Sequence, residues 1–202
     1  MAGARQFPTF RWLSAPFPLW LLLALPGVYY LAVGWLDAGA ALHPRNPGLM
    51  SCWLLIISMA VTPLGMMFGP LAWVVWLRTN RRYIGVAAFL YGALHTVVWL
   101  KSATMAKIGF SFIGSTMLAG WIAIGIMLAM TLTSRDRSVR KLGRNWRVLQ
   151  QLIYPAGILI LIHWLFTENE YLEVATYTLP LVALTIWRIW RNRNRLGSAA
   201  GE

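Results

Sequence analysis

Two histidines, His95 and His163, are the residues of this chain best placed to do chemistry, because each lies inside a long apolar run. An ionisable side chain inside hydrocarbon is costly, so such residues usually have a function. His95 lies about 11 residues into the run 84–100 and His163 about 15 residues into the run 148–166, or roughly 16 and 22 Å along a helix. Because both runs are predicted to cross the membrane in the same direction, we expect the two imidazoles at one depth, in the outer half of the bilayer.

Two imidazoles that face each other across a helical bundle can supply both axial ligands of a six-coordinate haem iron. Small residues near the histidines would leave room for the macrocycle: Ala88, Gly92, Ala156 and Gly157. Two alternatives stay open from the residues alone. The histidines could be packing residues hydrogen-bonded to neighbouring groups, with the small residues serving close helix contact, or they could relay protons.

Other chemistries lack the side chains that they need. The single cysteine, Cys52, excludes a disulfide framework and a Cys-ligated iron–sulfur cluster. Two histidines without a neighbouring Cys, Asp or Glu fall short of a tetrahedral zinc set. No Ser–His–Asp set can be assembled within the apolar runs, so we expect no catalytic nucleophile. His43, beside Pro44 and Arg45, is expected to be a solvated loop residue.

The elements that position these histidines are predicted from composition. The chain has 202 residues, of which 58% are hydrophobic and 12% are charged, whereas about a quarter are charged in an ordinary soluble domain. Six apolar runs approach the length of about 20 residues that crosses a bilayer core: 19–36, 49–68, 84–100, 112–132, 148–166 and 172–190. We therefore expect an all-α membrane protein, a six-transmembrane-helix bundle. We also expect one domain over residues 1–202, without a separate catalytic domain.

Local sequence signals decide two details of this prediction: whether the first helix is retained, and whether a seventh span exists. The first run follows Arg5 and Arg11, as in a signal peptide, but no convincing small-residue cleavage site follows, so we expect a retained helix. The segment Gly69–Leu77 is apolar but short, and it begins with Gly69 and Pro70. We predict that it is an interfacial turn rather than a seventh span.

Basic residues set the predicted orientation, because cytoplasmic loops of membrane proteins collect Lys and Arg. One side of the bundle receives most of them: Arg5, Arg11, Arg78, Arg81, Arg82, Arg135, Arg137, Arg140, Lys141, Arg144, Arg147, Arg188, Arg191, Arg193 and Arg195. The other side receives these charged residues: Asp37, Arg45, Lys101, Lys107, Glu168, Glu170 and Glu173. This asymmetry predicts cytoplasmic N- and C-termini. The net charge of +12 is then explained by contact with anionic membrane lipid, and we expect no nucleic-acid partner.

Four stretches resemble the ferric-reductase-like transmembrane domain: 61–64 (VTPL), 81–85 (RRYIG), 89–95 (FLYGALH), and 145–154 (NWRVLQQLIY), which leads to His163. They are similar in particular to the haem-binding membrane subunits of bacterial methionine sulfoxide reductase systems. The double arginine that leads to His95, together with the tryptophan that leads to His163, carries the likeness, since either alone is a weak motif. The resemblance covers the second to fifth predicted spans.

The resemblance implies a b-type cytochrome in the bacterial inner membrane, with His95 and His163 as the axial ligands of haem b. Such a subunit takes electrons from the quinone pool or a reduced flavin. It passes them to a periplasmic molybdopterin-containing reductase, the MsrP-like partner of a heterodimer, which repairs oxidised methionine in envelope proteins. The chain would then be an electron-transfer subunit rather than the catalytic subunit.

Gln150 departs from this family pattern, because members commonly carry a histidine there. It lies roughly 20 Å inward of His163, at the predicted level of Arg81 and Arg82. Arginine stays protonated and glutamine is a poor haem ligand, so we expect one haem and not a second, inner one. We predict that Arg81, Arg82 and Gln150 form a cationic site for a quinone or a flavin such as FMN. That these arginines only contact lipid headgroups remains an open alternative.

Two functions from other classes are also compatible with a small helical membrane protein. A transporter or proton-conducting protein would use the intramembrane histidines as relays, although the chain has neither intramembrane carboxylates nor an internal repeat. A structural assembly factor would need no cofactor. The visible absorption spectrum of the purified protein separates these functions, since only a haem protein gives a Soret band.

Overall fold

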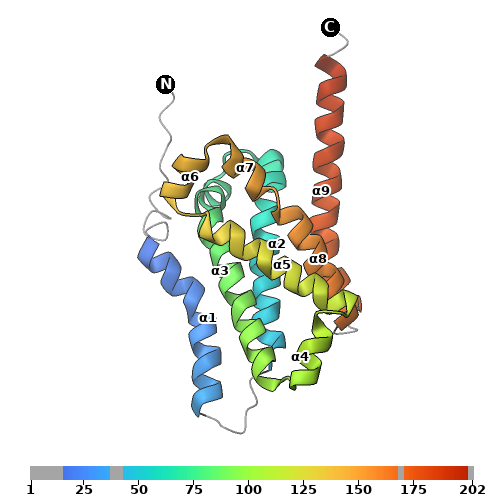
Figure 1. The fold of residues 1–202 in the computed structure, drawn as a ribbon. Helices are drawn as coiled ribbons and strands as arrows, with labels where there is room; N and C mark the ends of the chain where they lie inside the picture. The colour runs from blue at the N-terminus through green and yellow to red at the C-terminus, as the bar shows by residue number, and fades with distance from the viewer. Residues whose placement is uncertain (1–15, 37–42, 168–170, 200–202) are drawn as a thin grey trace.

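The computed structural model describes residues 16–36, 43–167 and 171–199, and these ranges consist of helices joined by short turns (Figure 1). Its helices are α1 (Pro16–Leu36), α2 (Arg45–Phe68), α3 (Ala72–Ser102), α4 (Met105–Ser111), α5 (Ser115–Leu132), α6 (Asp136–Leu142), α7 (Arg144–Gln150), α8 (Ile153–Thr167) and α9 (Tyr171–Ala199). No β-strand occurs in the described ranges. The predicted all-α class is therefore confirmed.

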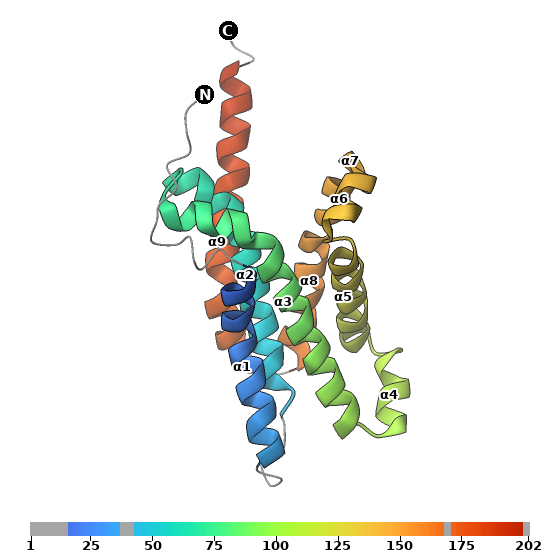
Figure 2. The same ribbon diagram turned by 90° about the vertical axis from the view of Figure 1, so that its left-hand side faces the viewer.

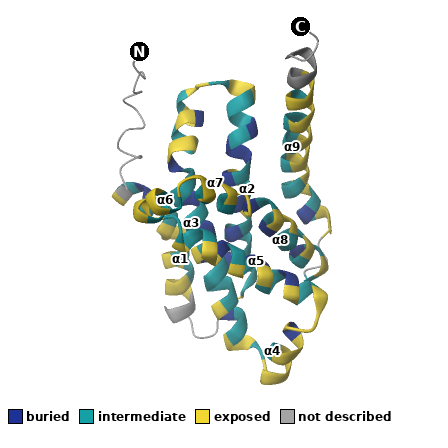
Figure 3. Cartoon of the chain, turned by 45° about the horizontal axis from the view of Figure 1, so that its top comes forward, coloured by how far each residue is buried: buried dark blue, intermediate teal, exposed yellow. Residues whose placement is uncertain are grey.

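Five helical stretches among the described residues are long and apolar enough to cross a membrane: Arg45–Phe68, Ala72–Ser102, Ser115–Leu132, Arg144–Thr167 and Tyr171–Asn194. A shorter apolar stretch, Phe17–Val33, lies in α1, where a sixth span was predicted. Large apolar side chains remain exposed along these helices, as the outward faces of α1 and α9 illustrate (Figure 3). Helices of spanning length with exposed apolar faces indicate a multi-pass membrane protein, in which such faces are in contact with lipid.

The predicted interfacial turn at Gly69–Leu77 is wrong over most of its length. Gly69, with a φ of +67°, ends α2, and α3 already begins at Ala72. The helix then continues for 31 residues through the arginines that were used as a boundary. A charged residue marks the level of a membrane surface but does not break a helix, and nothing between 72 and 102 is a proline.

The predicted fourth span, 112–132, corresponds to α5, which begins at Ser115 after the separate short helix α4 ends at Ser111. The predicted fifth span, 148–166, is divided near its start. In the fifth, the backbone turns at Gln151 and Leu152 between α7 and α8. Pro155 accounts for this turn, since its ring lacks an amide hydrogen and crowds the carbonyl of Gln151.

Two pairs of neighbouring helices form the centre of the bundle. The helices α2 and α3 lie side by side, α5 packs against α8, and α3 and α5 join the two pairs (Figure 2). The core consists of Leu55, Ala88, Met127, Ile153 and Ala156. Alanines at the crossing points let the backbones approach closely, which is how membrane helices gain packing energy where no water is excluded.

The outer helices α1 and α9 are attached by specific hydrogen bonds. The Tyr91 hydroxyl of α3 donates to the carbonyl of Leu23 and accepts from the amide of Gly27, both at 2.8 Å. These two hydrogen bonds reach α1 next to Pro26, which interrupts the regular backbone hydrogen bonds of that helix. On the other side, Arg188 of α9 donates to the Tyr154 hydroxyl at 2.7 Å, and Arg191 donates to the carbonyl of Met66 at 2.6 Å.

The two ends of the bundle differ in what they carry. Toward one end lie the start of α1, the α2–α3 turn, α6, α7 and the end of α9, uppermost in Figure 1. Toward the other lie α4 and the start of α2. We call these the upper end and the lower end. The predicted charges at Arg5, Arg11, Asp37, Glu168 and Glu170 lie outside the described residues.

Candidate functional site

The structure brings His95 and His163 together. His95 lies in the later half of α3 and His163 in the later half of α8, and both side chains are half-buried. The centres of the two imidazole rings are 6.3 Å apart, and the ring planes are nearly perpendicular, at 84°. Two residues 68 positions apart in the sequence are therefore neighbours at one level of the bundle, toward its lower end.

Each ring is held by a backbone carbonyl through the same atom. The Nδ1 atom of His95 lies 2.8 Å from the Pro44 carbonyl oxygen, and that of His163 lies 3.0 Å from the Thr116 carbonyl oxygen. A carbonyl only accepts, so each Nδ1 carries the hydrogen. In a neutral imidazole this places the lone pair on Nε2, the arrangement typical of a metal-binding histidine with an outer hydrogen bond.

Two glycines make room for this arrangement. A Cβ atom added at Gly48 of α2 would lie 2.8 Å from the Nδ1 atom of His95, and one added at Gly120 of α5 would lie 3.0 Å from the Nδ1 atom of His163. Both distances are shorter than an ordinary van der Waals contact. Each imidazole therefore rests against the bare backbone of a neighbouring helix, one turn of chain away from the carbonyl that holds it.

The two rings open into one cavity, which we call the outer cavity. Among the described residues, its lining is mostly apolar and contains one charged side chain, Arg45. Other members are Trp99, Trp121, Thr96 and Thr167. The space that protein atoms leave here, counted out through the open mouth, is about 1070 Å³.

The residues present fit a haem. With metal–nitrogen bonds of about 2 Å and nitrogens about 1 Å from each ring centre, two imidazoles on opposite sides of a metal ion have centres about 6 Å apart. The observed separation is 6.3 Å, and hydrogen bonds through Nδ1 aim the other nitrogen away from the backbone. No group of three or more His, Cys, Asp or Glu side chains lies together within the described ranges, so a tetrahedral protein-ligated site is not offered there.

The small residues predicted to leave room for a ring are placed differently. Ala88 is fully buried in the packed core, and Ala156 lines a second cavity at the upper end. Gly92 lines the outer cavity, whereas a Cβ atom at Gly157 would meet the Met59 sulfur at 3.1 Å. Thus only Gly92 leaves the room that was predicted. The others serve helix packing, because residues two turns from a histidine lie at another level.

The second cavity, which we call the inner cavity, gathers the polar residues predicted to converge. Its lining includes Arg78, Arg81, Arg82, Arg147 and Gln150, and the space left by protein atoms is about 1200 Å³. These five residues come from α3 and α7, two helices far apart in the sequence that meet at this cavity. Arg144, in the same short helix α7 as Arg147 and Gln150, is not among the lining residues.

Two of these residues have protein partners. The Gln150 amide donates to the Met130 carbonyl at 3.4 Å. Arg82 pairs with Asp136 of α6 across 2.5 Å, and this guanidinium holds the pKa of the Asp136 carboxyl below its usual value. Because Asp136 is exposed, the pair adds little stability and mainly orients Arg82.

The two cavities are separated by a thin apolar layer. Met127 lines both of them, and it packs in the core with Leu55, Ala88, Ile153 and Ala156. The structure therefore provides two distinct sites, one with paired imidazoles and one with clustered guanidinium groups, on opposite sides of this apolar cluster.

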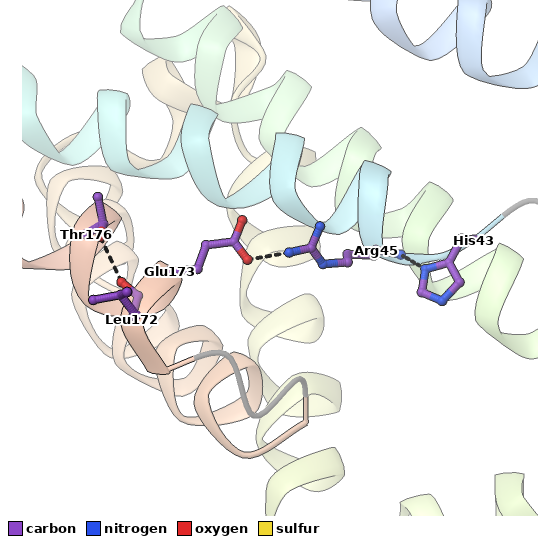
Figure 4. Close-up of polar contacts among 5 residues, drawn as sticks. All are labelled: His43, Arg45, Leu172, Glu173 and Thr176. Carbon is purple, nitrogen blue, oxygen red and sulfur yellow. Dashed lines mark hydrogen bonds and ion pairs between the residues drawn. The ribbon is translucent and has the colours of Figure 1, made fainter.

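His43 is not part of either cavity lining. It is exposed, its Nδ1 accepts a hydrogen bond from the Arg45 amide at 3.3 Å, and its carbonyl accepts one from the Tyr30 hydroxyl at 2.6 Å. This agrees with its prediction as a loop residue (Figure 4). Sequence reasoning did not single out Arg45, Gly48 and Gly120, whose contacts join distant segments and leave no local pattern.

Comparisons with known proteins give the family. A family model described as ferric reductase like transmembrane component matches residues 47–161. A Ralstonia nicotianae protein named protein-methionine-sulfoxide reductase heme-binding subunit MsrQ is 32% identical over 91% of this chain and 89% of its own length. A protein of the same name from Azospira oryzae is 33% identical over 90% of this chain and 82% of its own length. No solved structure matches the chain.

We predict that Gly48→Ala lowers haem binding, since the new methyl group would push the His95 ring off the Pro44 carbonyl. Disturbing such an outer hydrogen bond typically weakens metal binding by about 10- to 100-fold. Gly120→Ala should have a smaller effect in the same direction, because its contact is longer. Haem retained per purified chain is the measurement.

Gly125→Ala, on the same helix as Gly120 but with nothing within 4 Å of its added Cβ, is the matched control. Equal haem content in all three variants would contradict the prediction.

Proposed function

The chain belongs to the ferric reductase like transmembrane family, among relatives of MsrQ, and we propose that it is a haem-binding electron-transfer subunit of a methionine sulfoxide reductase system. The observation that supports this most is the pair of imidazoles, 6.3 Å apart, each fixed through Nδ1 by a backbone carbonyl. Packing histidines need no such matched pair.

His95 and His163 are the proposed axial ligands of one haem b. When bound, the haem would supply one-electron chemistry at its iron. The protein orients both imidazoles through the Pro44 and Thr116 carbonyls. Trp99 and Trp121 both line the cavity, with their ring centres 6.4 Å apart.

The proposed topology is six spans, including α1, with both termini in the cytoplasm of a bacterium and the bundle in its inner membrane. The upper end carries the arginines of α3, α6, α7 and α9, while the lower end carries Lys101, Lys107 and the Arg45–Glu173 ion pair. By the positive-inside rule the upper end is cytoplasmic. The paired imidazoles then lie toward the periplasm. Residues 1–202 act as one domain in this proposal.

The inner cavity is the proposed entry point for electrons. Guanidinium groups bind flat, multiply hydrogen-bonding anions and carbonyls well, so a quinone or a flavin such as FMN suits Arg81, Arg82 and Gln150. The same residues are poor haem ligands, so the proposal assigns one haem to the chain. Electrons would cross the layer around Met127 to the outer site. From there they would pass to a periplasmic MsrP-like molybdopterin reductase bound in a heterodimer, which repairs oxidised methionine.

The proposed ligands are tested by His95→Ala and His163→Ala. Each change removes one axial bond, so we expect the low-spin absorption spectrum to be lost and electron flow to the partner to stop. The wild type should contain about one haem per chain and show sharp reduced α and β bands. His43→Ala, at the same end of the bundle, is the matched control and should leave the spectrum intact.

Full low-spin spectra in both His95→Ala and His163→Ala would exclude this ligand pair. A wild-type preparation that is colourless and takes up no added haem would contradict the proposed function as a whole. Two haems per chain would contradict the assignment of the inner cavity, and Gln150→His is the comparison variant for that outcome.

The entry site is tested by Arg81→Lys and Gln150→Ala. Lysine keeps the charge but cannot reproduce the planar fork of arginine. If the inner cavity binds the donor, we expect reduction of the haem by quinol or reduced flavin to slow by about tenfold, the usual cost of a lost hydrogen bond to a charged group, with an unchanged oxidised spectrum. The rate is followed by stopped-flow absorbance.

Arg144→Lys is the matched control for this experiment, because Arg144 lies at the same end without lining the inner cavity. Its reduction rate should equal that of the wild type. Unaltered rates in Arg81→Lys and Gln150→Ala, at normal membrane levels, would mean that the arginines contact only lipid and that the donor binds elsewhere.

A further inference from the structure

The hydroxyl of Ser58 is a polar group that the fold leaves unused in the wall of the inner cavity. Ser58 lies on α2, is 2% exposed and lines this cavity. Among the described residues, its hydroxyl has no hydrogen-bond partner. Two other buried serines, Ser51 and Ser111, each donate to a backbone carbonyl, at 2.8 and 2.7 Å. A buried hydroxyl without a partner costs free energy, so its place in a cavity wall indicates a ligand.

The neighbouring helix leaves this hydroxyl uncovered. Gly85 of α3 also lines the inner cavity, and a Cβ atom added there would lie 3.9 Å from the Ser58 oxygen. Among the described residues, that oxygen is the one atom beyond the adjoining stretch of α3 within 4 Å of the added atom. The space beside the hydroxyl therefore belongs to the cavity and is not filled by packing between α2 and α3.

Ser58 and Gly85 lie deeper in the inner cavity than the arginines. Gly85 follows Arg81 by four residues, so it lies about one helical turn, or roughly 6 Å, further along α3 toward the outer cavity. Leu55, three residues before Ser58 on α2, belongs to the core cluster and lines the same cavity. With increasing depth the wall thus changes from guanidinium groups to a neutral hydroxyl, and then to the apolar core.

We propose that the Ser58 hydroxyl donates a hydrogen bond to a ring carbonyl of the electron donor, an inference that rests on the entry site proposed above. Quinones and the isoalloxazine ring of flavins share this chemistry, since both are flat rings whose carbonyl oxygens accept hydrogen bonds. Such a ring would lie beside Gly85, with a carbonyl at Ser58 and its more polar end at the arginines. Serine suits this position because its hydroxyl both donates and accepts, so it can also bond to the O–H of a reduced quinone.

This contact would hold the ring close to the layer that electrons must cross. Met127 lines both cavities and packs with Leu55 in the core cluster. A ring held at Ser58 lies about one turn nearer to that layer than a ring held by the arginines alone, and electron tunnelling slows steeply with distance. The competing explanation is that the hydroxyl turns to the carbonyl of Leu54, four residues earlier, as serines in helices often do.

The test measures the binding of two probes, FMN and menadione, to the purified full-length protein in detergent. Binding of FMN is followed by the quenching of its fluorescence, and binding of menadione by isothermal titration calorimetry. Ser58→Ala removes the hydroxyl and keeps a small residue that favours a helix. A hydrogen bond between neutral groups is worth a few-fold in affinity, so the probe that occupies the cavity should bind about fivefold more weakly to this variant.

The infrared spectrum of the bound probe gives a second readout, which a purely structural role of Ser58 would not change. A hydrogen bond lowers the stretching frequency of a carbonyl. The carbonyl band of an isotope-labelled probe should therefore move to higher frequency in Ser58→Ala. A response of FMN alone assigns the site to a flavin, a response of menadione alone assigns it to a quinone, and a response of both supports the shared chemistry.

Ser134→Ala is the matched control. Ser134 lines the same cavity, but its hydroxyl already donates to the Met130 carbonyl at 2.7 Å, so this variant should keep the wild-type affinity. Gly85→Ala is the second test variant. Its methyl group makes only an ordinary van der Waals contact with the protein, yet it fills the space beside the hydroxyl. Probe binding should therefore weaken although Ser58 is intact.

Unchanged affinity and an unshifted carbonyl band in Ser58→Ala would overturn the proposal, and the entry site would still stand if Arg81→Lys weakens probe binding. An equal loss of affinity in Ser134→Ala would also overturn it, because removing any hydroxyl from the wall would then suffice. If Ser58→Ala does not accumulate, wild-type affinity in Gly85→Ala would overturn the proposal. A wild-type protein that binds neither probe would contradict the entry site itself and this inference with it, whereas the haem site is tested separately by its absorption spectrum.

Discussion

The arrangement of this bundle depends on where two imidazole hydrogens are placed. In an apolar interior each ring N–H must find an acceptor, and here both find a backbone carbonyl on a neighbouring helix. That choice fixes the tautomer, turns each Nε2 into the nitrogen that carries the lone pair, and requires α2 and α5 to approach α3 and α8 at Gly48 and Gly120. The helix contacts and the proposed ligand chemistry are thus consequences of one interaction.

The same logic explains why two cavities coexist in so small a protein. The core cluster at Met127 and Ala156 closes the bundle at its middle, where small residues bring the helices together. Toward the ends the helices leave space, and the chemistry of each space follows from the membrane level that it occupies. Guanidinium groups line the cavity at the end that we assign to the cytoplasm, whereas at the opposite end Arg45 is the one cation among the described residues around the imidazoles.

The sequence predicted the features that depend on local composition or on depth along a helix. The apolar runs predicted helices, and residue counting placed His95 and His163 at one level. Prediction from the sequence failed where a single residue overrides the hydrophobic pattern. Pro155 divides the fifth run, and the arginines of α3 do not end a helix although they mark a membrane surface.

Contacts through space were beyond sequence reasoning altogether. Gly48 and Gly120 look like other glycines in membrane helices until the imidazoles are seen against them. Ala88 and Ala156 share a helix face with the histidines, but they lie two turns away, where the helices are in contact. The sequence placed Arg45 only among the few charged residues on the side opposite most of the arginines. Its position in the cavity wall depends on how α2 meets α3, α5 and α8.

Electron paramagnetic resonance of the oxidised, purified protein tests the central claim most directly, because it reports axial ligation and ring orientation together. Imidazole planes at 84° predict one low-spin ferric signal with the strong anisotropy that nearly perpendicular axial ligands produce. A spectrum that contains only high-spin iron, or two low-spin signals of equal intensity, would contradict the claim that His95 and His163 together hold a single haem.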